Sequence, residues 1–517
     1  MATRTGKPRR QYLIQKPNGQ VTPRVQRVGP EHFGVLCFDC AKARSKFMLA
    51  NFYGATLIAP QTVEHTRGHL RTALDQVRQA RDQHQLRDLI VAIERTGEYH
   101  RPVQRACRQD GLDTRLVHPL TSKQFRQPAN PGDKTDDTDL AAIFRAAVNG
   151  FGLIEPVLPD DHQQLQLLVR HRRDLVQKMS TLCCQIREEL HALMPGYAEC
   201  FSNLWDSQFA LPLARVTGSA EPLRQDDGQG LLRVLVEHQL AARKDGIAKI
   251  LAWAQQAPPP PPQHDLRRHI LVTLDDDRLG KIRHISRLER QIARRLCHTP
   301  YVLLLVIPGI NVVGAADAAA ELGPIHLYPN ANAITGRAGL MPSRYQSDQV
   351  DRPNGPLRRR ANRRLRTALM QVADNLVACN HYFSAKAVHW RGQGKDPRWI
   401  RVKVAKTFSR LLYAMVAGRQ LFRHPCRQEQ HYILHKLMEF HRLSDTPMAD
   451  VLADLDAATQ QLPRSACAAE AQPLAARLKE VERRKGPQPL TDLIPIVLAK
   501  LQARSVQSPA SEVSGLS

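Results

Sequence analysis

The sequence predicts a mixed α/β domain followed by a mostly helical remainder. Three observations predict this fold class. From Phe33 onward, short β-rich runs alternate with segments of helical periodicity. Beyond Pro159 the strand signals stop, and apolar residues recur at spacings of three, four and seven. The 517 residues, 42% of them hydrophobic, suffice for roughly three or four structural units of about 150 residues each.

The first domain is predicted from the order of its elements. Three consecutive strands are expected at 33–38, 46–52 and 55–59. After them the pattern predicts a helix at about 62–84, a strand at 89–93, a helix at 99–110, a strand at 114–118 and a helix from 135 to about 148. The order βββαβαβα predicts a mixed sheet with helices on its faces.

A long helical arm is predicted beyond this sheet. Its first helix has an apolar seam made of Leu165, Leu168, Leu175, Met179, Leu182, Ile186, Leu190 and Leu193. Such a seam pairs with another helix, as in a coiled coil. Further helices are expected at about 231–254 and 266–297, separated by the stiff proline tract 258–262.

The pattern divides the chain into five parts. Residues 1–30 are a basic flexible arm without acidic residues, and residues 31–157 form the mixed-sheet domain. Residues 158–300 form the helical, coiled-coil arm. Residues 301–422 form a mostly helical unit rich in Gly, Asn and Arg, and residues 423–517 form a helical extension that ends in a Ser-rich tail.

The charge of the chain predicts a polyanionic partner. Lys and Arg number 74 against 49 Asp and Glu, a formal net charge of +25, which favours nucleic acid. No apolar run approaches the ~18 residues of a membrane-spanning helix, so no membrane partner is expected. The ten cysteines are dispersed and do not form the framework of a secreted protein. We therefore expect a cytoplasmic location.

Four acidic residues of the first domain are predicted to converge. Asp39 ends the first strand, Glu94 ends the fourth, and Asp136 and Asp139 lie on one face at the start of a helix. Converging carboxylates repel each other unless hard cations lie between them, so this set predicts a Mg²⁺ site. Two ions ~4 Å apart would stabilise the attacking and leaving oxygens of a phosphodiester exchange. As alternatives, Asp136 and Asp139 simply cap the helix, or Asp137 takes a place in the site.

A serine and an arginine-rich segment are the second candidate site. Six arginines within residues 358–366, without an acid, predict a phosphate-binding face. The predicted nucleic-acid-binding residues there are Arg344, Arg358, Arg359, Arg360, Asn362, Arg363, Arg364 and Arg366. Ser347, or less favourably Ser343, lies in the preceding loop. Gly309, in the turn 307–310, either offers backbone N–H groups to phosphate or joins two helices.

Several of these segments resemble the DEDD transposases, which include Piv-type invertases and bridge-RNA-guided insertion-sequence recombinases. The N-terminal resemblance, to their RuvC-like (RNase H-like) domain, lies in Phe38-Asp39, Ile93-Glu94-Arg95-Thr96-Gly97-Glu98-Tyr99, Val117-His118-Pro119 and Lys134-Thr135-Asp136-Asp137-Thr138-Asp139. A second resembling segment, 302–422, contains Gly339-Leu340-Met341-Pro342, the Ser347 loop and Asn362-Arg363-Arg364-Leu365-Arg366. Two departures stand out: Asp348-Gln349 replaces the usual glycines, and Ala361 replaces a glycine.

The resemblance implies a DNA transposase or site-specific recombinase of a bacterial insertion sequence. Asp39, Glu94, Asp136 and Asp139 would hold Mg²⁺, and Ser347 would be the nucleophile that links to DNA. The resemblance also implies donor and target DNA, a structured bridge RNA as guide, a homodimer or homotetramer and association with the nucleoid. A shared site would then join acids and serine from different subunits through the Leu165–Leu193 seam. Two alternatives stay open: a RuvC-like metal-dependent nuclease without a covalent intermediate, and a non-catalytic nucleic-acid-binding scaffold.

Overall fold

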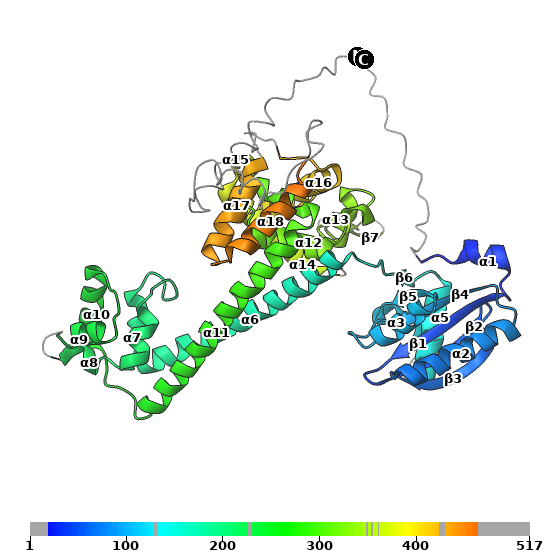
Figure 1. Cartoon of the computed structure of the whole chain (residues 1–517), viewed down its shortest axis with the longest axis horizontal. Helices are drawn as coiled ribbons and strands as arrows, with labels where there is room; N and C mark the ends of the chain where they lie inside the picture. Colours follow the sequence, from blue (N-terminus) through cyan, green and yellow to red (C-terminus); the bar gives the residue numbers. More distant parts are fainter. Residues whose placement is uncertain are drawn as a thin grey trace, which may run out of the picture. The chain divides into compact units, whose positions relative to one another are not determined.

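The structure is a computed structural model that describes residues 19–128, 132–225, 229–347, 350–352, 355–359, 361–422 and 430–463. The chain divides into two compact units, Met1–Val157 and Leu158–Ser517 (Figure 1). Parts of the expected sites lie outside the described residues, namely most of the basic arm, Asp348, Gln349, Arg360 and the Ser-rich tail.

A six-stranded mixed sheet forms the centre of the first unit and confirms the predicted fold class. Its strands are β1 (Phe33–Cys40), β2 (Arg44–Asn51), β3 (Thr56–Glu64), β4 (Asp88–Glu94), β5 (Asp113–Val117) and β6 (Leu153–Ile154). The spatial order is β3-β2-β1-β4-β5-β6. Strand β1 is parallel to β4 and β4 to β5, whereas the other neighbours are antiparallel.

Helices cover both faces of this sheet. Helices α2 (Arg67–Gln83) and α3 (Arg101–Gln109) pack against Leu36 and Phe38 on one face. Helices α1 (Thr22–Val28) and α5 (Asp136–Val148) pack on the other face, and α4 (Pro119–Arg126) lies against α5. Successive residues of a strand point to opposite faces, so each strand of the centre contributes to two apolar cores.

Two helices of the first unit differ from the sequence-based expectation. Helix α1 lies within the segment expected to be a flexible arm. Its Val25 is buried and its Arg24 forms ion pairs with Asp88 and Asp113. Helix α4 occupies a stretch in which no element was expected. Both helices carry a proline in their first turn, where its fixed φ favours helix initiation.

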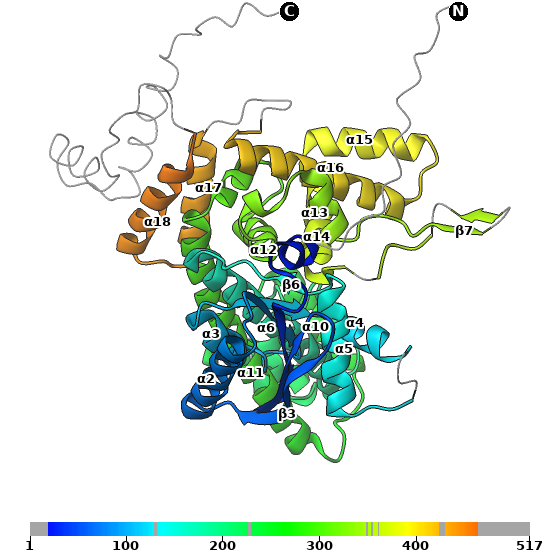
Figure 2. The ribbon, with the colours of Figure 1, turned by 90° about the vertical axis from the view of Figure 1, so that its right-hand side faces the viewer.

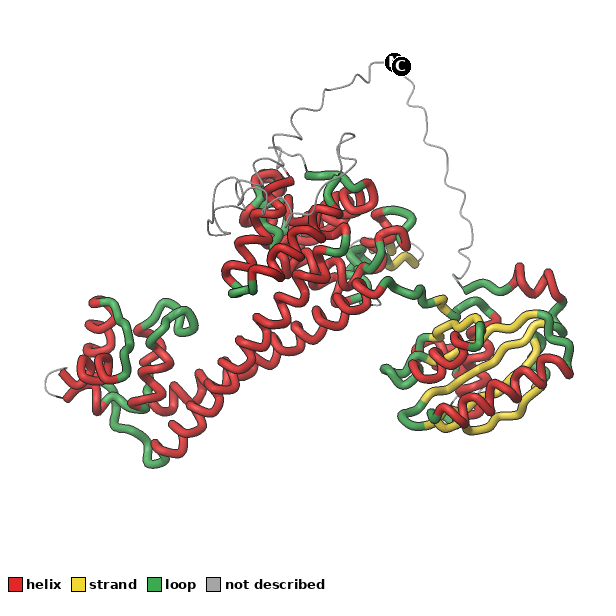
Figure 3. The backbone as a smooth tube through the Cα atoms, viewed as in Figure 1, coloured by secondary structure: helices red, strands yellow, loops and turns green. Residues whose placement is uncertain are grey.

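The second unit begins with a long helical hairpin. Helix α6 (Asp160–Leu193) packs along α11 (His264–Cys297), which Figures 1 and 3 show as two adjacent long helices. Leu165 is fully buried, and Leu175 packs with Ile285 and Leu288 of α11. The predicted seam is therefore used within the chain.

Short helices connect the ends of this hairpin. They are η1 (Tyr197–Cys200), α7 (Ala210–Thr217), α8 (Glu221–Arg224), α9 (Gln229–Glu237) and α10 (Lys244–Gln256). The single amphipathic segment expected at 231–254 is thus two helices. Gln239, with a φ of +52°, lies between them, and its left-handed backbone interrupts the helix.

The rest of the second unit is a helical domain with one small hairpin. Its helices are η3 (Pro300–Val306), α12 (Val312–Leu322), η4 (Ile325–Leu327), α13 (Ala331–Arg337), α14 (Arg363–Cys379), α15 (His381–Gly392), α16 (Pro397–Gly418), α17 (Gln430–Leu443) and α18 (Met448–Gln461). The hairpin of β7 (Tyr345–Ser347) and β8 (Val350–Arg352) extends away from these helices (Figure 2). Among the described residues, no helix combines the length and apolar character needed to cross a membrane.

Candidate functional site

Strand pairing brings Asp39 and Glu94 together. In the parallel ladder of β1 and β4, Phe38 lies opposite Ile93, so the following two acids end neighbouring strands. The odd-numbered residues of β1 and the even-numbered residues of β4 pack against α5. Because side chains alternate along a strand, Asp39 and Glu94 both belong to the face that α5 covers.

Helix α5 brings two further acids to the same face. The Thr135 hydroxyl caps the helix by accepting a hydrogen bond from the backbone N–H of Thr138, 3.2 Å away. Asp136 is the first helical residue, and Asp139 follows in the same turn and is buried. Burial raises the pKa of Asp39, and the charges of Asp139 and Asp136 add to the rise. The four predicted acids therefore share one electrostatic environment.

The pKa values show how closely Asp39 and Glu94 interact. Burial raises the pKa of Glu94 to about 7, and the charges of Asp39 and Asp139 contribute to the rise. Burial also raises the pKa of Asp39, although a hydrogen bond from Glu94 acts in the opposite direction. The two carboxyl groups therefore lie close enough to influence each other's protonation. Two neighbouring carboxyl groups disfavour each other's charged form, so one of them has a raised pKa.

Cationic side chains hold the acids of α5. Arg126 of α4 forms an ion pair with Asp139, and Lys46 Nζ lies 2.7 Å from Asp137 Oδ1. Lys46 is also the cross-strand neighbour of Asp39 on β2. In the described ranges, no group of three or more His, Cys, Asp and Glu side chains has the spacing that holds a metal ion. The four acids share a face, but their oxygens are not arranged as a ligand set.

The chemistry of this face nevertheless fits a hard divalent cation. All the candidate donors are carboxylate oxygens, which Mg²⁺ prefers. The hydroxyl of Ser122 is buried close to Glu94 and partly offsets the rise in the pKa of Glu94. No described residue is a well-aligned hydrogen-bond partner for this hydroxyl. A buried polar group without a partner is compatible with an additional ligand or water at this position.

The β7–β8 hairpin places Ser347 at an exposed position. Ser347 ends β7, pairs with Val350, and has no hydrogen-bond partner for its hydroxyl among the described residues. Arg344 binds Asp351 across the hairpin with two bonds of 2.9 and 2.6 Å. Ser343 differs, because its hydroxyl donates to the Pro356 carbonyl over 3.0 Å. The hydroxyl of Ser343 is therefore engaged in a hydrogen bond, whereas that of Ser347 is not bound to a described residue.

Helix α14 holds the base of this hairpin. The Nε of Arg366 donates to the Ala338 carbonyl over 2.9 Å, and its Nη2 donates to the carbonyls of Gly339 and Arg358. Gly339 has a φ of +62°, and a Cβ there would lie 2.5 Å from the Cβ of Ala361. Only glycine fits at this close approach. Arg366 therefore serves as a structural clamp in this conformation.

A buried carboxylate links the hairpin base to the helical arm. The side chain of Asn362 caps α14 and donates to Glu321 Oε2 of α12 over 3.0 Å. Arg170 of α6 binds both Glu321 oxygens, at 3.1 and 3.3 Å. Burial acts to raise the pKa of Glu321, but the hydrogen bonds from Arg170 and Asn362 lower it overall. Glu321 thus stays ionised although it is 1% exposed.

Two family models match the parts of the chain that carry these features. Residues 36–195 match a DEDD transposase model of the IS110 type, and residues 301–388 match the model of the transposase IS116/IS110/IS902 family. The chain belongs to the IS110-type DEDD transposases. It is also similar to a probable family 20 transposase of Pseudomonas aeruginosa, with 26% identity over 343 residues that cover 66% of this chain and 87% of that protein. DEDD transposases process DNA and generally use divalent metal ions.

The turn 307–310 of this transposase packs against α14 and α17. Gly309, with a φ of +93°, approaches α14 so closely that a Cβ would lie 3.0 Å from the Asn375 carbonyl. Lys436 Nζ donates to the carbonyls of Ile307 and Ile310 at 2.9 and 2.8 Å. These contacts favour the interpretation of Gly309 as part of a turn between helices over that of a phosphate-binding residue.

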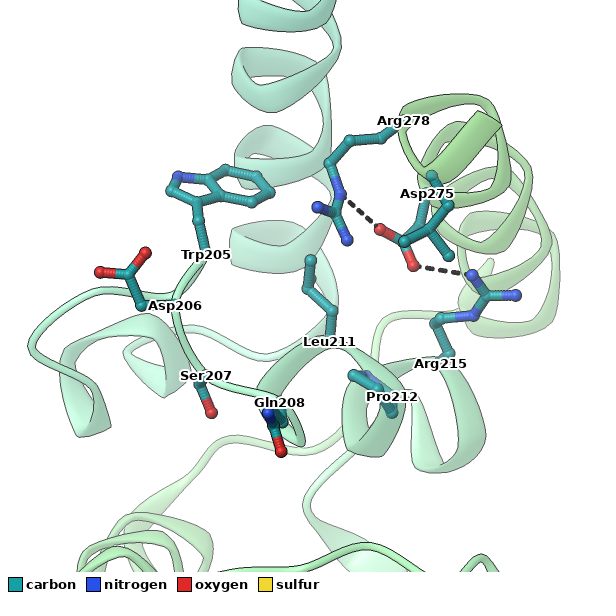
Figure 4. Close-up of a pocket in the computed structure, with 10 residues that line it drawn as sticks. Trp205, Asp206, Ser207, Gln208, Leu211, Pro212, Arg215, Asp275 and Arg278 are labelled. Atoms are coloured by element: carbon teal, nitrogen blue, oxygen red, sulfur yellow. Dashed lines mark hydrogen bonds and ion pairs between the residues drawn. The ribbon is translucent and has the colours of Figure 1, made fainter. Parts of the chain in front are cut away.

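A cavity of about 460 Å³ lies in the arm of the transposase, between α7, α11 and the loop around Trp205 (Figure 4). Asp275 forms ion pairs of 2.7 Å with both Arg215 and Arg278 at its wall. The guanidinium of Arg278 also lies 5.5 Å from the centre of the Trp205 ring. None of the predicted site residues lines this cavity.

Several residues at the two sites were not expected from the sequence. The position of Lys46 beside Asp39 follows from the register of β1 and β2, which the sequence does not give. Arg126 and Ser122 lie on α4, in a segment where no helix was expected. Glu321 lies in an Ala-rich helix far from the arginine-rich segment in the sequence. Two acids, Asp317 and Glu321, within the otherwise apolar residues 312–322 were the available signal, since buried acids are usually paired.

Proposed function

We propose that this transposase exchanges DNA strands through a covalent serine intermediate and depends on Mg²⁺. The observation that carries the proposal is the common environment of Asp39, Glu94, Asp136 and Asp139 on one face of the sheet. Their oxygens would hold one or two Mg²⁺ ions, which supply Lewis-acid stabilisation of phosphate oxygens. Glu94 would release its proton when the cation binds, because the proton and the cation compete for the same carboxylate oxygens.

Ser347 would be the nucleophile. Its exposed hydroxyl is not committed to a hydrogen bond with described residues, in contrast to that of Ser343. The Ser347 Oγ would form a bond to phosphorus while the bond to the leaving DNA oxygen breaks. The hydroxyl proton would pass to a basic group and the leaving oxygen would gain a proton. The hydroxyl of a second DNA end would then attack phosphorus and release Ser347.

The arginine-rich segment would hold the nucleic acid. Arg358, Arg359, Arg363 and Arg364 are exposed, and guanidinium groups bind phosphates in bidentate fashion. Donor and target DNA are the proposed substrates, with a structured bridge RNA as guide. The proposal includes a homodimer or homotetramer, as the family resemblance implies, in which the carboxylates of one unit and Ser347 of the other act on one phosphodiester.

Trapping of the intermediate tests the proposed chemistry. The transposase is incubated with labelled DNA of an element end and Mg²⁺, then denatured, and covalent protein–DNA adducts are measured and mapped by mass spectrometry. We expect an adduct at Ser347, none in Ser347→Ala, and retention in the matched control Ser343→Ala.

Two other outcomes would support the alternatives. DNA nicks without any adduct would indicate a nuclease that uses water, for which the acids of the first unit would suffice. Normal recombination by Asp39→Ala would reject both catalytic schemes. Loss of recombination with intact binding in that variant would reject the scaffold.

A further inference from the structure

Helix α16 presents a stripe of cationic and aromatic side chains to solvent. Trp399, Lys403, Lys406 and Arg410 recur at spacings of four, three and four, so they lie along one face of the helix. The opposite face, with Val404, Phe408 and Leu412 among others, is fully buried. The stripe spans about 16 Å at ~1.5 Å per residue.

The indole at the start of the stripe is fixed but accessible. Asp396 caps α16 by accepting a hydrogen bond from the Arg398 N–H at 2.7 Å and one from the Trp399 N–H at 3.4 Å. The Trp390 ring packs edge-on against Trp399, with ring centres 5.8 Å apart and an angle of 88°. The Trp399 side chain is still 42% exposed. A large aromatic group is thus held at the surface by the protein.

Cationic side chains lie around this indole, and few acidic residues balance their charge. Lys395 Nζ and Lys403 Nζ each lie over the Trp399 ring, 5.8 Å from its centre, so a base that stacks on the indole takes the place of one of these flexible cations. Residues 389–410 contain seven Lys and Arg but only one acid, Asp396. Within the described ranges, Lys395, Lys403, Lys406 and Arg410 form no ion pair. The pKa of Lys406 is lowered by burial and by the charges of Lys403 and Arg410. The stripe therefore offers uncompensated positive charge to an anionic ligand.

We propose that Trp399 and the stripe Lys403–Lys406–Arg410 bind a single-stranded segment of nucleic acid, in which an unpaired base stacks on the indole and successive phosphates contact the cations. Every base has an aromatic face, so stacking on a fixed ring recognises unpaired nucleotides without sequence preference. A base paired within a duplex is already stacked between its neighbours and cannot reach the ring. The inference rests on the proposed function only in that the transposase binds nucleic acid.

Binding of short strands by the full chain tests this site. The probes are a 12-nucleotide thymidine DNA, the matching uridine RNA, a 12-base-pair DNA duplex, and a strand of 12 abasic sugar-phosphates. We expect Trp399→Ala to weaken binding of the DNA or RNA single strand about tenfold. Binding of the duplex and the abasic strand should stay within about twofold. If Trp399→Ala loses affinity for the DNA strand alone, the RNA strand alone or both, the result shows which nucleic acid supplies the unpaired base.

Two further variants control the interpretation. Trp399→Phe keeps an aromatic ring and should retain most of the single-strand affinity. The double variant Lys403→Ala/Lys406→Ala should weaken all four probes and reduce the dependence of the logarithm of affinity on the logarithm of salt concentration by about one to two. Thermal unfolding confirms that each variant is folded.

The site is overturned by either of two results. One is unchanged single-strand affinity in folded Trp399→Ala. The other is an equal loss of affinity for the abasic strand, which would show that the indole acts only through the charge or shape of the surface. Both assays measure binding alone, so these results leave the adduct test of Ser347 unaffected.

Discussion

The electrostatics of the first site centre on one half-buried side chain, Glu94. It follows five apolar residues of β4 and is therefore carried to the end of a buried strand beside Asp39. Burial and the negative charge of Asp39 raise its pKa to about 7. A carboxylate in this position is costly unless it is protonated or bound to a cation.

The raised pKa of Glu94 predicts a pH-dependent stability in the absence of metal. Between its ordinary pKa of 4.5 and the folded value of about 7, the folded state binds more protons than the unfolded state. The free energy of unfolding therefore falls as pH rises through this window. Relative to Glu94→Gln, the wild type should lose on the order of 1–2 kcal/mol between pH 5 and pH 8. Urea unfolding in EDTA measures this difference.

The matched control for Glu94 is Glu98→Gln, on the exposed turn after β4. This variant should keep the pH dependence of the wild type. An identical pH dependence in Glu94→Gln and the wild type would contradict the interaction with Asp39.

Arginines of one segment are predicted to have different roles. Arg366→Ala removes hydrogen bonds to three backbone carbonyls and should cost about 1–3 kcal/mol of unfolding free energy. Arg359→Ala, at an exposed position, should change the free energy of unfolding by less than about 0.5 kcal/mol. It should lower the slope of the logarithm of DNA affinity against the logarithm of salt concentration by about one. Chemical unfolding and DNA titrations at several salt concentrations separate the two effects. Equal destabilisation by both variants would contradict the clamp role of Arg366.

At the scale of elements, the serine hairpin depends on helices distant in sequence. Asn362 at the start of α14, Glu321 in α12 and Arg170 in α6 form one connected set of hydrogen bonds. The arm and the hairpin base therefore share a buried carboxylate. A displacement of α6 would disturb the cap of α14 and, through it, the position of β7.

Truncation of Glu321 is expected to destabilise this set. Glu321→Ala leaves Arg170 and Asn362 without their acceptor and should cost about 2–4 kcal/mol. Glu321→Gln keeps one acceptor oxygen for Asn362 and should cost less. Adduct formation at Ser347 should fall in the same order when measured below the unfolding temperature of both variants. Full adduct formation by a folded Glu321→Ala protein would show that the hairpin does not need this support.

The sequence was most informative where local patterns determine structure. The buried runs of β1 and β4 and the periodic seam of α6 predicted these elements to within a few residues, and with them the positions of Asp39 and Glu94. Helices α1 and α4 are short and lack a long amphipathic repeat, so periodicity could not predict them. Contacts such as Arg126 with Asp139 join side chains through tertiary packing, which no single sequence pattern encodes.

At the scale of the whole molecule, the arm changes the expectation for assembly. Leu175 and its neighbours along the α6 seam pack against α11 of the same chain. The seam is therefore not available to pair with a second subunit in this conformation. A shared reaction centre, if subunits contribute different residues, has to be assembled through other surfaces.

Mixing of variants tests whether subunits share the reaction centre. Asp39→Asn and Ser347→Ala proteins should each fail to form the adduct, and a mixture should recover part of it, because one subunit supplies the acids and another the serine. The matched control is a mixture of Asp39→Asn with Glu94→Gln, which should stay inactive. If the first mixture also stays inactive after subunit exchange, acids and serine act from the same chain.

Binding of Mg²⁺ to the first unit tests the central claim most directly. Isothermal titration of the full chain should detect Mg²⁺ binding, and Asp39→Asn should weaken it at least about tenfold. Asp137→Asn should retain the wild-type affinity, since Asp137 is paired with Lys46 at the surface. Wild-type affinity in Asp39→Asn would show that the acids on this face do not hold the ion together.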